Sequence, residues 1–108
     1  MLQEILYNGT ETSVTGSTSL ISTKTTVIGL TTVEVIGTGA NKPKVIVQGK
    51  LINSSDAAYD SGWVDVVTFT DIDDNSVVGR AIGVFSAMRA VISNNGDNKT
   101  IQVSVGYN

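Results

Sequence analysis

The chain ends in the stretch Ile101-Gln102-Val103-Ser104-Val105-Gly106-Tyr107-Asn108, in which every second residue is apolar or aromatic. This period of two is typical of a β-strand with one buried face and one wet face. The apolar row needs a cover, so the strand has to pair inside a sheet. The stretch therefore predicts a domain built from strands, with its C-terminal residues in the core.

The composition agrees with an all-β domain. Val, Ile and Thr supply 38 of the 108 residues, whereas Leu supplies 5 and Ala 6. Side chains branched at Cβ are restricted at χ1 and fit a pleated sheet better than a helix. A chain of this length buries one hydrophobic core and is too short for a second. Residues 1–108 are therefore expected to form a single domain.

Turn-rich segments divide the chain into short apolar runs at fairly even spacing, as in a β-sandwich or a small barrel. The expected strands lie at residues 2–7, 20–36 (one or two strands), 44–53, 63–69, 77–84, 85–93 and 101–107. The run 44–53 has apolar residues on both faces, which is typical of a central strand or of one that meets another chain. Gly79 and Gly83 make the run 77–84 short or edge-like.

Three segments are less regular. Residues 8–19 are rich in Thr, Ser and Gly, which indicates a loop or an extended arm that becomes ordered on a partner. Within 20–36 the apolar residues change phase, which predicts a bulge or tight turn at 29–32. The segment 85–93 fits a helical face or a strand. We favour the strand, because residues 94–98 would then close a five-residue hairpin into the last strand.

Charge and hydropathy exclude two classes of partner. The net charge is −3, from 7 basic and 10 acidic residues, and the basic residues are scattered from Lys24 to Lys99. A nucleic-acid-binding protein gathers such residues into a positive surface. The start of the chain lacks a secretion signal, and no apolar run is long enough to span a bilayer. We expect no nucleic acid and no membrane as partners, and synthesis in the cytoplasm.

The chain has neither His nor Cys, which excludes most hydrolytic dyads and triads. A carboxylate pair remains, formed by Asp60 with Asp65, or by Asp71 with Asp73 or Asp74. However, Asp is common in turns because its side chain bonds to the local backbone. The sequence therefore predicts that the protein is not an enzyme, with no catalytic residues and no cofactor.

The stretch Asp71-Ile72-Asp73-Asp74-Asn75 has oxygen ligands at alternate positions, as in the first half of a calcium loop. Ser76 stands where that loop requires glycine, and Ile82 stands where it requires the closing glutamate. A looser calcium site between β loops is the alternative. The favoured interpretation is an ordinary acidic turn, with no metal ligands.

Tyr59 and Trp63 flank a polar loop and could stack on a sugar ring. The other interpretation makes Trp63 the central plug of the sandwich core, which the usual burial of aromatic side chains favours. Arg89 lies within an apolar strand, where a charge needs a partner, and Asp65 is the predicted one.

Three features of the C-terminal half occur together. They are a Val-x-Val-x-Gly strand at 45–49, a Trp-containing strand at 63–69, and an Arg-bearing strand that leads through an Asn/Gly turn to alternating valines at 88–105. This half resembles small β-sandwich proteins of tailed-phage virions, which include capsid decoration (cement) proteins and some tail-surface modules. The resemblance implies a jelly-roll-like sandwich that often forms trimers on capsid lattice points. It carries over no functional residue.

We therefore expect an all-β fold, a single antiparallel β-sandwich that is jelly-roll-like, with an arm or loop-rich segment at 8–19. The expected function is that of a non-enzymatic structural component of the phage virion, in first place a capsid decoration or head-stabilising protein. Its partners would be itself, as a homo-oligomer with a trimer as first expectation, and the major capsid protein or another virion protein. The alternative is a carbohydrate- or receptor-binding module of a phage tail or adhesin that uses Tyr59 and Trp63. Head or tail location, oligomer number and strand order stay open.

Overall fold

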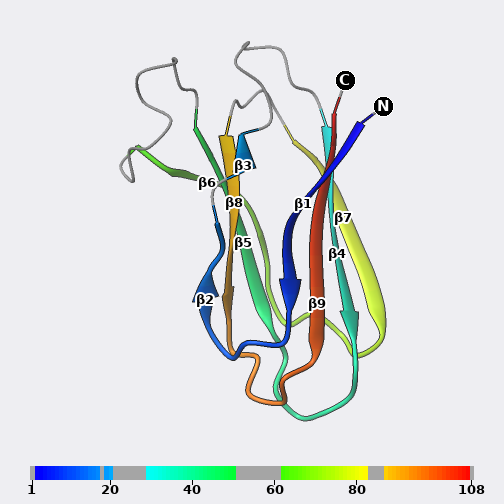
Figure 1. The fold of residues 1–108 in the computed structure, drawn as a ribbon. Coiled ribbons are helices and arrows are strands. Elements are labelled where there is room, and N and C mark those ends of the chain that lie inside the picture. Colours follow the sequence, from blue (N-terminus) through cyan, green and yellow to red (C-terminus); the bar gives the residue numbers. More distant parts are fainter. Residues whose placement is uncertain (1, 18, 21–28, 51–61, 83–86, 108) are drawn as a thin grey trace.

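The computed structural model describes residues 2–17, 19–20, 29–50, 62–82 and 87–107, and these residues form strands without a helix (Figure 1). The strands are β1 (Leu2–Gly9), β2 (Val14–Thr15), β3 (Ser19–Leu20), β4 (Gly29–Ile36), β5 (Lys44–Lys50), β6 (Val64–Phe69), β7 (Ser76–Ile82), β8 (Ala87–Ser93) and β9 (Thr100–Tyr107). Within this part of the chain, no helix is long and apolar enough to cross a membrane.

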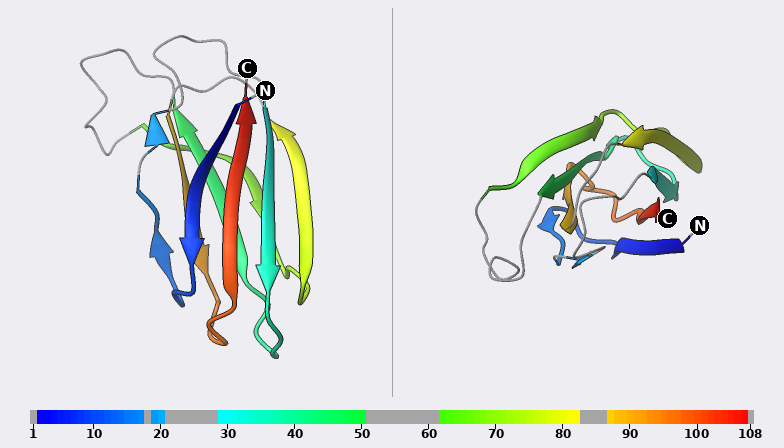
Figure 2. Two further views of the ribbon diagram at one scale, coloured as in Figure 1. Left: turned by 45° about the vertical axis from the view of Figure 1, so that its right-hand side comes forward. Right: turned by 90° about the horizontal axis from the view of Figure 1, so that it is seen from above.

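Two antiparallel sheets pack against each other (Figures 1 and 2). The four-stranded sheet has the order β1-β9-β4-β7, and the five-stranded sheet has the order β2-β8-β5-β6, with β3 also paired to β8. The pairs are nested: β1 pairs with β9, β2 and β3 with β8, β4 with β7, and β5 with β6. This is the strand order of a jelly roll, a long hairpin rolled into two sheets. The predicted antiparallel sandwich is confirmed.

The core lies between the two sheets and is built from alternate residues of four central strands. The fully covered apolar side chains that alternate along these strands are Val33 and Val35 of β4, Val45 and Val47 of β5, Met88, Ala90 and Ile92 of β8, and Ile101, Val103 and Val105 of β9. Burial of each larger apolar side chain contributes about 1.5–3 kcal/mol. The terminal alternation thus supplies core residues, as the sequence predicts.

Strands β8 and β9 do not form the predicted hairpin. They lie in opposite sheets, so the apolar row of β8 faces that of β9 across the core. Asn94 and Asn98, with φ of 58° and 51°, adopt the left-handed conformation and allow the short loop to turn from one sheet to the other. The hairpin prediction was wrong because a corner between sheets needs no more residues than a hairpin loop.

The predicted bulge at 29–32 is absent from β4. This strand pairs with both neighbours without a shift, so Leu30 stays on the outer face and Thr31 takes the buried position. A register shift occurs instead in β1, between Ile5 and Tyr7. The change of phase in the sequence therefore marks an exposed leucine, which a sheet tolerates when the remaining inward residues fill the core.

The other strand predictions agree with the structure where it describes them. β5 is central, between β8 and β6, and the segment that fits both a helix and a strand contains β8 from Ala87 onward. β7 is an edge strand, as expected. The segment 8–19 is loop-rich but is not an unpaired arm, because β2 pairs with β8 and Gly16 N donates to Ala90 O at 2.8 Å.

Candidate functional site

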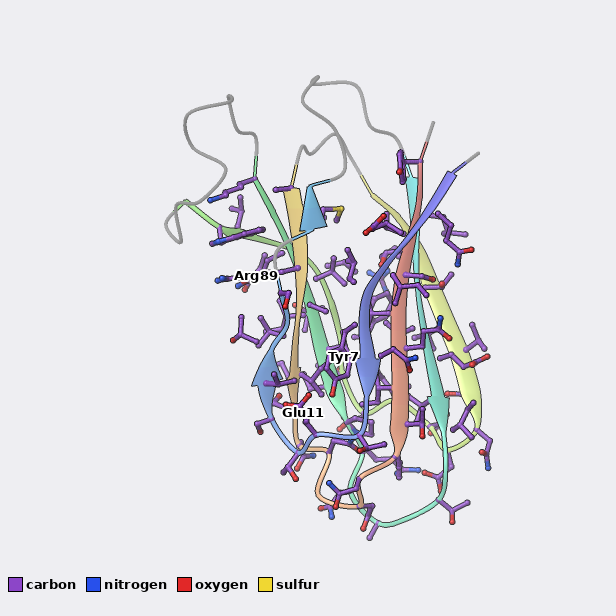
Figure 3. All side chains as sticks on the ribbon, viewed as in Figure 1. Tyr7, Glu11 and Arg89 are labelled. Atoms are coloured by element: carbon purple, nitrogen blue, oxygen red, sulfur yellow. The ribbon has the colours of Figure 1, made fainter. Side chains whose placement is uncertain are left out.

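A polar cluster that includes the Trp63 indole lies on the solvent-facing side of the five-stranded sheet. Arg89 Nε donates to Gln48 Oε1 at 2.8 Å, and Gln48 Nε2 donates to Asp65 Oδ1 at 2.9 Å. The guanidinium carbon of Arg89 lies 4.4 Å from the centre of the Trp63 ring, and Lys50 Nζ lies 4.8 Å from it. Figure 3 shows Arg89 pointing away from the four-stranded sheet. The predicted pairing of Arg89 with Asp65 therefore runs through Gln48.

Trp63 is not part of the buried core cluster, so the core-plug interpretation was wrong. The pairing of β5 with β6 shifts between Val47 and Gln48, where β6 holds one extra residue. Such a bulge changes the face to which the following side chains point. Val67 and Phe69 therefore lie in the core, whereas the indole lies outside it. The alternation alone does not reveal the bulge.

The predicted sugar site is only partly described. Tyr59 lies outside the described residues. The Trp63 ring is half-buried beneath two cations, each contact worth about 0.5–2 kcal/mol, and its Nε1 is buried without a hydrogen-bond partner in the described part of the chain. A sugar stacks on a free ring face, and cations already occupy part of this one.

The acidic turn after β6 belongs to a polar network at the end of the sandwich opposite the termini (Figure 1). Asp74 Oδ1 lies 2.6 Å from Lys99 Nζ, and the Lys99 side chain is 0% exposed. The same ammonium donates to the carbonyl oxygens of Gly39 and Asn41, at 3.3 and 2.6 Å. Lys99 thus ties together the loops that follow β4, β6 and β8.

The other acidic residues of this turn have separate roles. The Asp73 side chain is 84% exposed and lies 3.9 Å from Lys42 Nζ. Asp71 has φ of 51°, a conformation that Asp adopts more readily than most residues, as expected in a turn. No group of three or more His, Cys, Asp or Glu side chains in the described segments could hold a metal ion. Asp60, of the alternative carboxylate pair, lies outside those segments.

The hydrogen bond from Lys99 is the main cause that holds the pKa of Asp74 below its ordinary value of 3.8. The lowered pKa favours folding at pH values above 3.8, and this contribution is lost as the pH falls through the folded-state value. We therefore expect Asp74→Asn to destabilise the protein near neutral pH and to cost progressively less as the pH falls below about 4. Urea denaturation of both proteins across this range measures the difference.

The matched control is Asp73→Asn, because the Asp73 side chain is exposed and its carboxylate faces the half-exposed Lys42, not the buried Lys99. We expect its small effect to change little with pH. A cost of Asp74→Asn that is the same at every pH would contradict the assignment of Asp74 as the counter-ion of Lys99.

Two buried polar side chains, Asn95 and Tyr7, hold the N-terminal segment against the end of the sandwich that contains Lys99. The sequence pattern does not identify either of them. Asn95, 0% exposed, donates through Nδ2 to the carbonyl oxygens of Glu11 and Lys99 and accepts from Lys99 N. The Tyr7 hydroxyl donates to Glu11 Oε1 at 3.3 Å and accepts from Glu11 N (Figure 3). Burial is the main cause that raises the pKa of Tyr7 above 10.0. These contacts make the end a structural anchor.

The outer face of the four-stranded sheet is almost uncharged. Residues at its described outward positions are Gln3, Ile5, Asn8, Leu30, Thr32, Glu34, Ile36, Val77, Gly79, Thr100, Gln102, Ser104 and Gly106. Among these, Ile5, Leu30, Ile36 and Val77 are large apolar side chains with 47–62% exposure. The Thr32 and Ser104 hydroxyls bond to each other at 2.8 Å beside a shallow hollow of about 190 Å³. We refer to this surface as the outer face.

A groove of about 440 Å³ runs between β6, the loop after it, and β7. Its apolar lining residues are Phe69, Ile72 and Val78, and its charged ones are Asp71, Asp73 and Arg80. Arg80 reaches from β7 over the Phe69 ring, with its guanidinium carbon 6.0 Å from the ring centre. Figure 2 shows β6 and β7 next to each other along one open side of the sandwich.

Comparisons with protein-family models, with curated proteins and with solved structures found no match to this chain. They therefore do not link it to the virion proteins that its C-terminal half resembles.

Proposed function

We propose that the protein is a non-enzymatic structural protein of a phage particle, a capsid decoration protein that acts as a homo-oligomer through protein–protein contacts. The observation that carries this proposal is the outer face, which has one charged residue, Glu34, among thirteen described outward positions. Protein interfaces carry fewer charges than the rest of the surface, and several exposed large apolar side chains on one face indicate an interaction site. The partner proposed for this face is the major capsid protein.

The rest of the molecule supports a scaffold role. The jelly roll is a stiff fold found in many capsid proteins and lectins. Asp74, which could have served in a catalytic carboxylate pair, is engaged by Lys99 and Gly39 N. The loops that Lys99 ties together hold one end of the sandwich in a fixed shape. A protein that docks on many equivalent sites of a lattice needs such a fixed shape.

Co-sedimentation with capsids of the phage that encodes the protein tests this proposal. We expect the protein to pellet with capsids in a fixed ratio, and Leu30→Lys to reduce binding at least tenfold, because the new charge would have to be desolvated. The matched control is Val64→Lys on β6, where the original side chain is 56% exposed and belongs to the other sheet. Absence of binding, or equal losses in the two variants, would contradict the proposal.

One observation favours the alternative function, sugar or receptor binding. Trp63 lies outside the core, on the solvent-facing side of the five-stranded sheet. Trp63 is the sole tryptophan of the chain, so its fluorescence reports on this site alone. A decoration protein should show no change in emission with millimolar oligosaccharides. A saturable change would favour the sugar-binding module.

A further inference from the structure

Each sheet of a sandwich has two edge strands, and proteins usually protect such edges from pairing with other chains. Three of the four edges described here carry such a feature. β2 is two residues long. β1 has a register shift between Ile5 and Tyr7. The β5–β6 pairing shifts between Val47 and Gln48, and β6 also carries Asp65. Short length, bulges and charges all discourage the addition of a further strand.

The fourth edge, β7, is neither short nor bulged. It pairs with β4 through seven consecutive residues without a shift. It contains no proline, and Arg80 is its one charged residue. Val77, in its second position, is 62% exposed, the highest exposure of the large apolar side chains in the described segments. A regular edge with a single charge is a template for another strand.

We propose that β7 is a dimer interface, at which β7 of one copy pairs antiparallel with β7 of a second copy about a two-fold axis at Gly79. The two four-stranded sheets then join into one continuous sheet. This inference rests on the proposed function, because it gives the homo-oligomer its contact surface. It does not depend on which face binds the capsid.

The register about Gly79 is self-complementary. Gly79 is the middle residue of β7, so this register pairs all seven residues, with Ser76 opposite Ile82 and Val78 opposite the second copy's Arg80. Val78 lines the groove between β6 and β7, which also contains the carboxylates of Asp71 and Asp73. This copy's own Arg80 also lines the groove and offsets one of the two carboxylates, so the second copy's Arg80 arrives at a groove with one net negative charge. The two-fold axis forms this contact twice, as an isologous interface requires.

The size of the contact sets the expected affinity. One pair of seven-residue strands with two side-chain contacts buries less than the roughly 800 Å² per partner of a standard stable interface. Such an interface belongs to the weak, reversible class. We therefore expect a dissociation constant in the micromolar range, which is about 8 kcal/mol of binding free energy at 1 μM.

Sedimentation equilibrium at concentrations from about 1 to 200 μM tests the dimer, since this range spans the expected dissociation constant. The wild-type protein should show a reversible monomer–dimer equilibrium. Val77→Lys should raise the dissociation constant at least tenfold, because lysine on an edge opposes strand addition. The matched control is Ile5→Lys, where a side chain 50% exposed on the opposite edge of the same sheet is changed in the same way. It should leave the dissociation constant unchanged.

Two further variants test the register itself. Arg80→Glu should weaken the dimer, and adding Asp73→Lys in the same chain should restore it. Gly79→Cys places the only cysteine of the chain opposite itself, at the 4.5–5.5 Å Cα separation of an antiparallel pair, which suits a disulfide. Mild oxidation should then give a covalent dimer. A Cβ at this position comes 3.2 Å from Thr31 O, so the melting temperature of the reduced variant must be compared with that of the wild type.

A monomer at every concentration, a trimer, or loss of the dimer in Ile5→Lys but not in Val77→Lys would overturn this inference. If the protein bound capsids but stayed monomeric, the β7 dimer would be contradicted and the proposed decoration role would be supported. If the protein formed the β7 dimer but did not bind capsids, the decoration role would be contradicted and the dimer interface would be supported. The two proposals therefore fail separately.

Discussion

Lys99→Met is expected to lower the free energy of unfolding by about 3 kcal/mol, because removal of one partner of a buried ion pair costs 3–5 kcal/mol and part of this pair reaches solvent. Methionine can fill the space of the lysine stem, so the loss is that of the ammonium. The carbonyl oxygens of Gly39 and Asn41 would then lose a buried donor, and Asp74 would lose its closest cation. For a domain of this size the melting temperature should fall by roughly 12–20 °C.

Lys42→Met is the matched control, because Lys42 Nζ lies 3.6 Å from the same Asp74 carboxylate but its side chain is 38% exposed. An exposed ion pair contributes about 0–1 kcal/mol, so we expect this variant to change stability by less than about 1 kcal/mol. Urea denaturation of the two variants measures both effects. Equal losses would show that Lys99 does not act as the tie between the loops.

Asn95→Ala is expected to cost about 2–3 kcal/mol. Its fully buried amide makes three hydrogen bonds to backbone groups, with distances of 2.9–3.1 Å, and two of them involve Lys99. Backbone groups left unpaired in a buried site cost about 1–3 kcal/mol each, and partial access of water reduces the sum. The carbonyl oxygen of Glu11 would lose its donor at the same time.

The matched control is Asn98→Gly in the same loop. Asn98 is exposed, with φ of 51°, and its Nδ2 donates to Thr10 O at 2.8 Å. Glycine keeps the left-handed conformation, so only the exposed hydrogen bonds to Thr10 O and Thr12 Oγ1 are lost and the cost should stay below about 1 kcal/mol. If thermal denaturation gave the same loss for both variants, the buried amide would not be the anchor described here.

Much of the fold could be predicted from the sequence because alternation is a local signal. The alternation directly identifies the buried face of β9, with Ile101, Val103 and Val105, and that of β5, with Val45 and Val47. The partner of each strand could not be predicted in this way. Pairing is decided by long-range closure of the core, and the loop at 94–98 fits a hairpin and an inter-sheet corner equally well.

The site was harder to predict, for two physical reasons. The sequence predicts the wrong face for Trp63, because one extra residue in β6 reverses the alternation and the sequence of β6 carries no sign of this bulge. Lys99 did leave a signal, since it continues the parity of Ile101 and Val103 into the interior. A lysine at a buried position usually has a specific partner. That partner, Asp74, lies 25 residues away in the chain and is recognisable only in the folded structure.

The nested pairing of the strands has a consequence for synthesis. β1 lies against β9, with Leu2 opposite Tyr107, and β4 needs β9 as its second neighbour. Contacts between such distant residues form slowly, because the chain must close long loops before it gains their energy. The four-stranded sheet stays incomplete until β9 has left the ribosome, and until then the apolar rows of β1 and β4 remain open to chaperones and to other chains.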